Sequence, residues 1–240
     1  MDTVAVVIPT YCEAENIENL IRDLQELKLN LMIVVVDDSS PDGTADIVKK
    51  LQKKYDNIHL ISRSEKLGLG TAITTGFGYV LKLRKIPNYI VTMDADYSYY
   101  PRDIPKLVDV AKKGYDLVIG SRYVREGNVI SWSLRRRFIS RLANLAAAIT
   151  VGTRLHDYTS GFRCYSKRYV KGVLPSLRSK TYEIQIETVK QARRGGFRIK
   201  EIPITFVNRK RGRSKLTSTE FQAFLSYVFK ALLNKKVEGK

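Results

Sequence analysis

The stretch LMIVVVDDSSPDGTADIVKK, residues 31–50, carries the pattern that decides the fold. Its continuous run of Val, Ile, Leu and Met over 31–36 is typical of a parallel strand that is covered on both faces. The polar segment that follows has the Pro, Asp and Gly of a turn, and Thr44 after it is a suitable helix N-cap. The stretch therefore predicts a strand, a tight loop and a helix in succession, which is the repeating unit of an α/β protein.

The same pattern recurs on both sides of this stretch. Short apolar runs that read as strands occupy residues 4–8, 58–61, 89–93 and 116–120. Helical spacing of apolar residues is found over 17–27, 70–83 and 104–113. Alternating strands and helices predict an α/β fold with a doubly wound, mostly parallel sheet and right-handed crossovers, which 240 residues can build as one domain.

Polar segments follow three of the predicted strands. PTYCE follows the first, DDSSPDGT the second, and DADY the strand over 89–93. Because ligands of such sheets bind beyond the carboxyl ends of the strands, we expect these segments to meet at one crevice. The dinucleotide fingerprint GxGxxG is missing after the first strand, and no Walker loop is present. These absences argue against an NAD site and against a P-loop ATPase.

Asp94 and Asp96 stand two residues apart at the end of an apolar run. In an extended chain both carboxylates point to the same side. Their repulsion at a few ångströms is about 1 kcal/mol in water and about 4 kcal/mol at the dielectric typical of a protein surface. A divalent cation with oxygen ligands would offset this repulsion and bind a phosphorylated substrate as well. The alternative is a turn with two solvated acids, because a DxD motif alone is weakly specific.

The charge of +18 is confined to the second half of the chain. Residues 1–120 hold 15 basic and 17 acidic residues, whereas residues 121–240 hold 27 and 7. This asymmetry indicates an anionic partner, which could be a nucleic acid, a phosphorylated ligand or a membrane surface. No apolar run approaches the roughly 20 residues of a membrane span, and no secretory signal precedes the first strand. We therefore expect a cytoplasmic protein, and the lack of helix-turn-helix or RNP signatures disfavours nucleic acid.

Taken together, the motifs resemble those of the dolichyl-phosphate mannosyltransferase group of family 2 glycosyltransferases. The resemblance extends to about residue 230. The motifs that carry it, in order, are PTYCE, VDDSSPDGT, KLGLGTA, MDADYSYYP, GSRY, Trp132 with the basic segment after it, DYTSGFR and RGRSKL. The resemblance implies a GT-A fold in one catalytic domain over 1–240. Residues 1–120 would form the nucleotide-sugar half, and residues 121–240 the basic half that meets acceptor and membrane.

This resemblance also implies a reaction. The enzyme would transfer a hexose, above all mannose from GDP-mannose, to the phosphate of dolichol or another polyprenol on the cytosolic face of a membrane. The transfer would invert the configuration at the anomeric carbon. The motifs leave open a UDP-sugar donor, with glucose or GlcNAc, and a soluble acceptor. A phosphate monoester is mostly a dianion at neutral pH, so it can attack without a protein base. A non-catalytic membrane adaptor is disfavoured by the intact acids and arginines, and a membrane-anchoring subunit is a further expected partner.

Site residues follow from the same resemblance, position by position. Asp96 and Arg122 would be catalytic, and Asp94, Asp96 and, as a weaker candidate, Ser98 would bind Mg²⁺ or Mn²⁺. The expected nucleotide-sugar residues are Pro9, Tyr11, Glu13, Asp38, Asp42, Lys66, Gly70, Asp94, Ala95 and Asp96. The expected acceptor-phosphate residues are Arg122, Arg136, Ser140, Arg209 and Lys215. Two alternatives remain: Asp42 could belong to a helix-capping turn, and Lys66 and Gly70 could mark only a helix entry.

Two segments have the pattern of amphipathic helices. Residues 135–150 combine Phe138, Leu142, Leu145 and Ile149 at helical spacing with four arginines, which suits the headgroup layer of a membrane. A core helix with a solvated basic face is the alternative. Residues 217–232 begin with the capping box TSTE and read as a second such helix, for which packing on the core is slightly favoured. His156 beside Asp157 reads as a structural loop residue, in a turn that lines the site.

Overall fold

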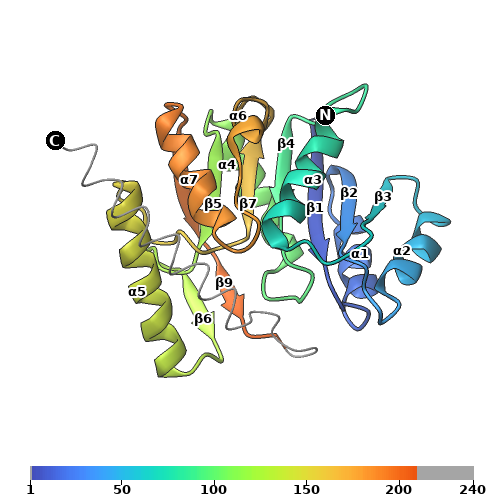
Figure 1. The fold of residues 1–240 in the computed structure, drawn as a ribbon, viewed down its shortest axis with the longest axis horizontal. Coiled ribbons are helices and arrows are strands. Elements are labelled where there is room, and N and C mark those ends of the chain that lie inside the picture. The colour runs from blue at the N-terminus through green and yellow to red at the C-terminus, as the bar shows by residue number, and fades with distance from the viewer. Residues whose placement is uncertain (1, 210–240) are drawn as a thin grey trace.

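A seven-stranded sheet forms the centre of the computed structural model, which describes residues 2–209 (Figure 1). Its strand order is β3-β2-β1-β4-β7-β5-β8, and a separate two-stranded sheet pairs β6 with β9. The strands are β1 (Thr3–Thr10), β2 (Asn30–Asp37), β3 (Ile58–Ser62), β4 (Tyr89–Thr92), β5 (Leu117–Ser121), β6 (Asn128–Ile130), β7 (Arg163–Ser166), β8 (Ile199–Pro203) and β9 (Thr205–Val207). The helices are α1 (Ile17–Gln25), α2 (Thr44–Gln52), α3 (Leu69–Leu81), α4 (Ile104–Lys112), α5 (Leu134–Val151), α6 (Lys167–Val173) and α7 (Ile184–Arg194), with short 3-10 turns at Pro101–Asp103 and Leu174–Ser176.

The predicted mostly parallel sheet is confirmed. All five strands expected from apolar runs lie in it, and β1 pairs in parallel with both β2 and β4. One strand differs from the expectation, because β7 is inserted antiparallel between β4 and β5. It begins at Arg163, directly after the segment 157–162. The inserted strand therefore brings that segment to the carboxyl end of β4.

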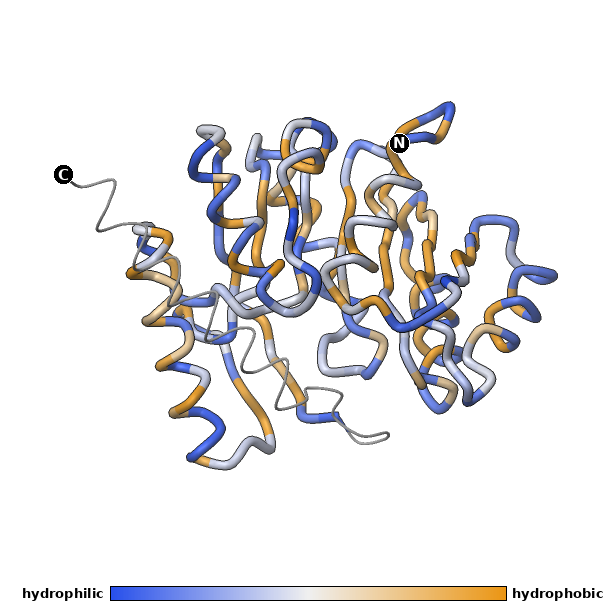
Figure 2. Tube along the Cα trace, in the orientation of Figure 1, coloured by the Kyte–Doolittle hydropathy of each residue, from blue (hydrophilic) through white to orange (hydrophobic). Residues whose placement is uncertain are grey.

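Helices cover both faces of the sheet and produce two hydrophobic clusters. One face is buried by α1, α2 and α4, and the other by α3, α6, α7 and the inner side of α5. Figure 2 shows hydrophobic residues concentrated along the strands, whereas α5 alternates between hydrophobic and hydrophilic residues. This layering is why the central strands are apolar on both faces and not alternating.

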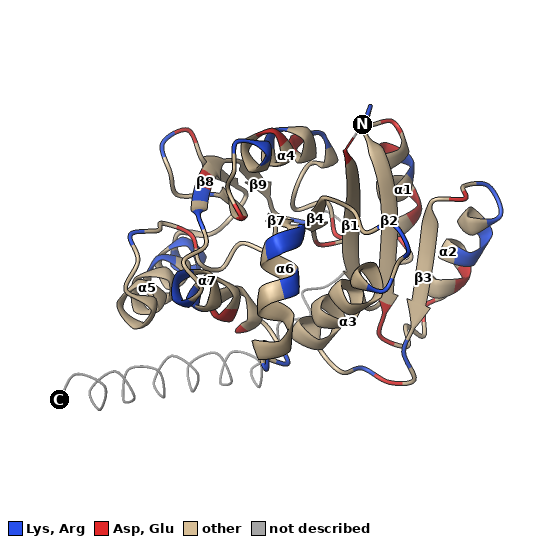
Figure 3. Ribbon diagram, turned by 90° about the horizontal axis from the view of Figure 1, so that it is seen from above, with Lys and Arg blue, Asp and Glu red and all other residues tan. Residues whose placement is uncertain are grey.

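Helix α5 and the small sheet β6–β9 lie beside the main sheet (Figure 1). The helix follows Trp132, as the basic amphipathic pattern predicted, and its N-cap Ser133 accepts a hydrogen bond from the Arg136 backbone N–H. Figure 3 shows acidic residues mixed with basic ones along α1, α2 and α4, whereas lysines and arginines predominate on α6. The second predicted amphipathic helix, over 217–232, lies outside the described residues.

One helix boundary differs from the sequence expectation. Thr44 is the first residue of α2, and the N-cap is Gly43 with φ of 87°. Glycine adopts this left-handed backbone conformation at the lowest steric cost, so the chain makes its sharp turn at Gly43. The Thr44 hydroxyl instead donates to Asp42 at 2.6 Å and accepts the Glu13 backbone N–H at 2.9 Å. Thr44 thus joins the loop after β2 to the loop after β1.

Candidate active site

The carboxyl ends of β1, β2 and β4 surround a small cavity, called here the strand-end cavity. Its volume is about 100 Å³. Most of the residues expected to bind a nucleotide sugar are gathered in it, and the full lining is Pro9, Thr10, Tyr11, Glu13, Asp38, Lys66, Gly68, Leu69, Ala72, Asp94, Ala95, Asp96, Tyr182 and Arg209. The expectation that the polar segments after three strands meet at one place is confirmed by this arrangement.

Asp38 lines the strand-end cavity and is buried. Its carboxylate pairs with Arg63 and accepts the Gly68 backbone N–H at 3.1 Å. The neighbouring Asp37 accepts the hydroxyls of Thr10 at 2.8 Å and Ser40 at 2.6 Å. The two acids at the carboxyl end of β2 therefore fix the loops around the cavity, and both have protein donors. This structural role adds to the expected ligand contact of Asp38 and does not test it.

The start of α3 packs tightly against residues 179–181. The Gly70 backbone N–H donates to the Lys180 carbonyl at 2.9 Å, and a Cβ on Gly70 would overlap the Ser179 carbonyl. Gly68 has φ of 95°, which favours glycine, and a Cβ there would lie 2.6 Å from the Lys180 carbonyl oxygen. Gly70 does not line the cavity. Its small size lets the neighbouring segment approach, and this approach carries Tyr182 to the site.

Lys66 lines the strand-end cavity and lies over the ring of Tyr11. Its Nζ is 4.6 Å from the centre of the Tyr11 ring, which is within the range of a cation–π contact. Both residues line the cavity. An ammonium held beside an aromatic ring can bind an anionic ligand that enters between the loops.

Asp94 and Asp96 form the most charged part of this site. Asp96 is buried, its Oδ1 accepts the Ser98 backbone N–H at 3.0 Å, and its Oδ2 pairs with Arg209 at 2.7 Å. Burial, with the Asp96 charge next in importance, raises the pKa of Asp94 to about 7, although Arg209 opposes the shift. Negative charge at this place is therefore only partly neutralised by the protein.

The donor set of this acidic pair fits a hard divalent cation. In the part of the chain from 2 to 209, no group of three His, Cys, Asp or Glu side chains could enclose a metal ion. Mg²⁺ and Mn²⁺ commonly bind through one or two carboxylates and complete their coordination with water and phosphate oxygens. Two carboxylates with an excess of negative charge match that mode. The site is thus suited to a cation that a phosphorylated ligand helps to hold.

A second cavity of about 240 Å³, called here the arginine cavity, is lined by the same acids. It has Asp94, Asp96, Tyr182 and Arg209 in common with the strand-end cavity. Its full lining is Asp94, Asp96, Ser98, Tyr99, Arg122, Trp132, Arg136, Ile139, Ser140, Ala143, Thr159, Tyr182, Phe206 and Arg209. Arg122, Arg136, Ser140 and Arg209, all predicted from the resemblance, are therefore brought together. The two predicted halves of the site share one wall.

Arg122 is held in place by a buried carboxylate. Its Nε and Nη2 donate to the two oxygens of Asp157 at 2.7 Å each, and Nη2 also donates to the Thr159 hydroxyl. Burial alone would raise the pKa of Asp157, but the Arg122 charge and hydrogen bonds outweigh it and hold this pKa below its usual value. Since these bonds use Nε and Nη2, Nη1 is the guanidinium nitrogen that can serve a ligand.

Arg136 contributes a second cation from the first turn of α5. Its guanidinium lies 4.1 Å from the Trp132 ring centre, and Nη1 donates to Asn208 at 3.0 Å. Burial, followed by the charges of Arg209 and Arg122, lowers the pKa of Arg136. These like charges make the arginine cavity favourable for an anion. The Ser140 hydroxyl accepts a hydrogen bond from the Tyr123 hydroxyl at 2.7 Å, so the Ser140 hydroxyl proton can be donated to a further acceptor.

Sequence reasoning missed several residues that build this site. Asp157 was expected only as part of a turn, and it is the partner of Arg122. Arg163, fully buried, donates to the carbonyls of Tyr158 at 2.8 Å, Ser160 at 2.8 Å and Gln185 at 2.7 Å, so it fixes the segment that carries Asp157. The DYTSGFR motif contains both residues, but only the fold shows what each one contacts.

Three expected residues lie elsewhere or serve another purpose. Asp42 does not line either cavity; it accepts the backbone N–H groups of Ala14 and Thr44, as in the helix-capping alternative. Ser98 lines the arginine cavity, and its backbone contacts Asp96. Lys215 lies outside the described residues, as does the whole of the RGRSKL motif at residues 211–216. His156 donates its backbone N–H to Glu201 at 2.9 Å, and its ring Nδ1 lies 3.0 Å from the same carboxylate, consistent with a structural loop role.

The chain is similar to known proteins over most of its length. Residues 5–174 match the family described as "Glycosyl transferase family 2". The chain is 37% identical over 219 residues to a polyprenol monophosphomannose synthase of Mycolicibacterium smegmatis, covering 90% of this chain and 82% of that protein. It is 36% identical over 215 residues to an undecaprenyl-phosphate mannosyltransferase of Micrococcus luteus, covering 89% and 87%.

Solved structures with a similar fold include two enzymes with bound ligands. Glucosyl-3-phosphoglycerate synthase from Mycobacterium tuberculosis, in complex with Mn²⁺, UDP and glucosyl-3-phosphoglycerate, has a TM-score of 0.68 at 20% identity and covers 97% of this chain and 79% of its own. A mannosyltransferase from Pyrobaculum calidifontis, in complex with GDP-Man and Mn²⁺, has a TM-score of 0.60 at 19% identity and covers 88% and 58%. At these identities the likeness concerns the fold.

Proposed function

Because this chain belongs to the family 2 glycosyltransferases, we propose that it transfers a mannosyl group from GDP-mannose to the phosphate of a polyprenol. The enzyme class and the GT-A type of fold agree with the expectation from the motifs. The observation that carries the proposal is the shared wall between the two cavities. A donor in the strand-end cavity and a phosphate in the arginine cavity would both face Asp94 and Asp96.

On the donor side, the acidic pair would hold Mg²⁺ or Mn²⁺ together with the donor pyrophosphate. When bound, the cation would neutralise charge on the departing nucleoside diphosphate. Asp94 and Asp96 would hold it, and Lys66 lies where it could contact an anionic ligand beside Tyr11. Tyr182 belongs to both cavities, so it is placed to contact the sugar between them.

On the acceptor side, the arginines would position the attacking phosphate. Its second pKa near 6 makes it mostly a dianion at neutral pH, so no protein group has to remove a proton. Guanidinium groups suit this task because they present N–H donors in a planar fork. Nη1 of Arg122, the cation Arg136 and the Ser140 hydroxyl all border the same cavity. Their contribution is positioning, which is a recognised source of rate.

A polyprenyl phosphate resides in a membrane, and we propose that α5 meets the bilayer surface. The described part of the chain contains no helix that is long and apolar enough to span a bilayer. Helix α5 exposes Leu134 at 84%, Phe138 at 64% and Leu145 at 58%, with arginines between them. Exposed apolar side chains flanked by cations are typical of helices that lie in the headgroup layer. The cytosolic side of the membrane and an anchoring subunit stay predictions.

A direct assay tests the proposal. Purified protein would receive GDP-mannose, UDP-glucose or UDP-GlcNAc, a polyprenyl phosphate in detergent, and Mg²⁺ or Mn²⁺. We expect a mannosyl lipid phosphate from GDP-mannose only, and loss of product on addition of EDTA. Product from a UDP-sugar would replace the donor assignment, and transfer to soluble phosphates alone would refute the lipid acceptor. Full activity in EDTA would contradict the cation's role.

A further inference from the structure

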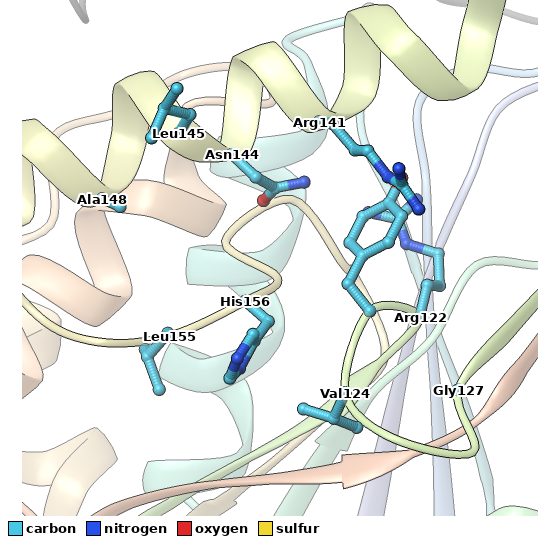
Figure 4. Close-up of a pocket in the computed structure, with 10 residues that line it drawn as sticks. Arg122, Val124, Gly127, Arg141, Asn144, Leu145, Ala148, Leu155 and His156 are labelled. Carbon is cyan, nitrogen blue, oxygen red and sulfur yellow. The ribbon is translucent and has the colours of Figure 1, made fainter.

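A third cavity lies between α5 and the loops that precede β6 and β7 (Figure 4). It is called here the α5 cavity and measures about 420 Å³, which is within the roughly 300–1,000 Å³ of small-molecule sites. None of the roles proposed above uses this space. Its lining is partly polar and partly apolar, so a ligand that has both characters would fit it best.

The guanidinium groups and the aliphatic side chains of α5 lie at different ends of the α5 cavity, and Asn144 and His156 also line it. Figure 4 shows Arg122 and Arg141 on one side, and Leu145, Ala148 and Leu155 on the other. Arg141 and Ala148 belong to the same helix, and at 1.5 Å per residue their separation along its axis is about 10 Å, the span of about two isoprene units. The cavity thus leads from guanidinium groups toward aliphatic side chains.

The polar end adjoins the arginine cavity. Arg122 lines both cavities. The hydrogen bond from the Tyr123 hydroxyl to Ser140, 2.7 Å long, marks the boundary, because Tyr123 lines the α5 cavity and Ser140 lines the arginine cavity. A phosphate bound by Arg122 and Ser140 would therefore lie next to the polar end of the α5 cavity.

The apolar end adjoins the exposed apolar side of α5. Leu145 lines the cavity and is nevertheless 58% exposed, and the neighbouring Leu142 and Ile149 are exposed by 49% and 52%. An apolar chain that rises from a bilayer along these side chains would reach the cavity at Leu145, which belongs to both the exposed side of α5 and the cavity lining. The cavity is therefore continuous with the surface proposed to contact the membrane.

We propose that the α5 cavity binds the first isoprene units of the acceptor, those next to its phosphate. This inference rests on the proposed function, and it adds a site for the hydrocarbon chain to the site for the phosphate. Burial of apolar surface stabilises such a complex by about 25 cal/mol per Å². The enzyme would thereby select a lipid phosphate over a small soluble one through contacts at Leu145, Ala148 and Leu155.

Chain-length dependence of the reaction tests the inference. Water-soluble phosphates of one to four isoprene units would be compared in kcat/KM. For the wild type we expect a gain of roughly tenfold or more between one and three units, since each added unit buries apolar carbon. Ala148→Phe and, as a second variant on a different element, Leu155→Phe would fill the cavity and abolish the gain, while the one-unit acceptor reacts as before. Leu142→Phe is the matched control, because it adds an aromatic ring on the outer side of α5 without filling the cavity. An undiminished gain in both filled variants would overturn the inference.

A binding readout separates this inference from the proposed function. A three-unit phosphate carrying a photoreactive diazirine would be cross-linked to the protein and the adducts mapped by mass spectrometry. We expect adducts at residues 145–155, prevented by excess polyprenyl phosphate and not by phosphatidylcholine. Adducts confined to the outer residues near Phe138, or equal protection by phosphatidylcholine, would contradict a chain site. Absence of sugar transfer with correctly placed adducts would instead refute the proposed reaction alone.

Discussion

Replacement of Asp157 by Asn tests how the arginine cavity is held together. The change removes the carboxylate that neutralises Arg122 but nearly keeps its shape. Arg122 is only 6% exposed and Asp157 is completely buried, so water cannot solvate the unpaired guanidinium. Asp157 also lies near the buried Arg163 and is stabilised by its charge. Removal of one partner of a buried ion pair costs about 3–5 kcal/mol, and we expect the free energy of unfolding to fall by that amount.

Urea unfolding followed by circular dichroism measures this loss. Asp109→Asn is the control, because it removes an exposed pair with Lys112 at 3.4 Å, for which a loss below about 1 kcal/mol is expected. In the Asp157→Asn variant the KM for the lipid phosphate should also rise more than the KM for the nucleotide sugar, since Arg122 is proposed to bind only the lipid phosphate.

The same pair predicts how stability changes with pH. In Asp157, burial raises the pKa, but Arg122 outweighs it and the pKa in the folded state lies below the ordinary value of about 3.9. Its stabilising contribution is therefore complete above that ordinary value and is lost as the pH falls through the folded-state pKa. The difference between wild type and Asp157→Asn should be constant down to about pH 5 and shrink below about pH 4. A loss no larger than that of Asp109→Asn, or a difference independent of pH, would refute this reasoning.

Three further changes test other parts of the site. Gly70→Ala should lower the free energy of unfolding by about 1–3 kcal/mol and weaken binding of the nucleotide sugar, because the new methyl group would overlap the Ser179 carbonyl. Gly78→Ala is the control: its Cβ would meet no atom of another described segment within 4 Å, and the change should stabilise α3 by up to about 1 kcal/mol. Equal effects of the two changes in thermal unfolding would count against tight packing at Gly70. Asp96→Asn should reduce turnover by about 100-fold or more and abolish the effect of Mn²⁺ on GDP binding measured by calorimetry. If the variant keeps metal-dependent activity, Asp96 is not a metal ligand. The double change Phe138→Gln and Leu142→Gln should lower binding to anionic vesicles by about tenfold or more in flotation assays. Activity on a soluble acceptor with one isoprene unit should persist. Unchanged flotation would show that α5 does not contact the bilayer.

The shared wall between the two main cavities explains why acids and arginines occur together in this chain. Asp94 and Asp96 face both cavities, and Arg209 pairs with Asp96 from the segment after β9. Two anionic substrates that approach each other need positive charge on both sides of the reacting atoms. A cation at the acids and guanidinium groups beyond them would supply it. The basic second half of the sequence is in this way linked to the acidic strand end of the first half.

The sequence by itself determined the central strands and the place of the acids. Continuous apolar runs such as residues 31–36 identify strands buried on both faces, and all five such runs lie in the sheet. Asp94 and Asp96 were correctly placed at a strand end, because they come directly after an apolar run that reads as a strand. These features depend on residues that are close in sequence, where the periodicity of side chains records which face is covered.

Only the tertiary structure decided which distant residues meet. The antiparallel strand β7 has four residues and an ordinary composition, and it finds its place between β4 and β5 by pairing with both. That insertion brings Asp157 to Arg122, 35 positions away, and the glycines of α3 admit the segment that carries Tyr182. Such contacts arise from the order of strands and from steric fit between elements. Neither leaves a local pattern, so a single sequence can name the chemical groups of a site but not their partners.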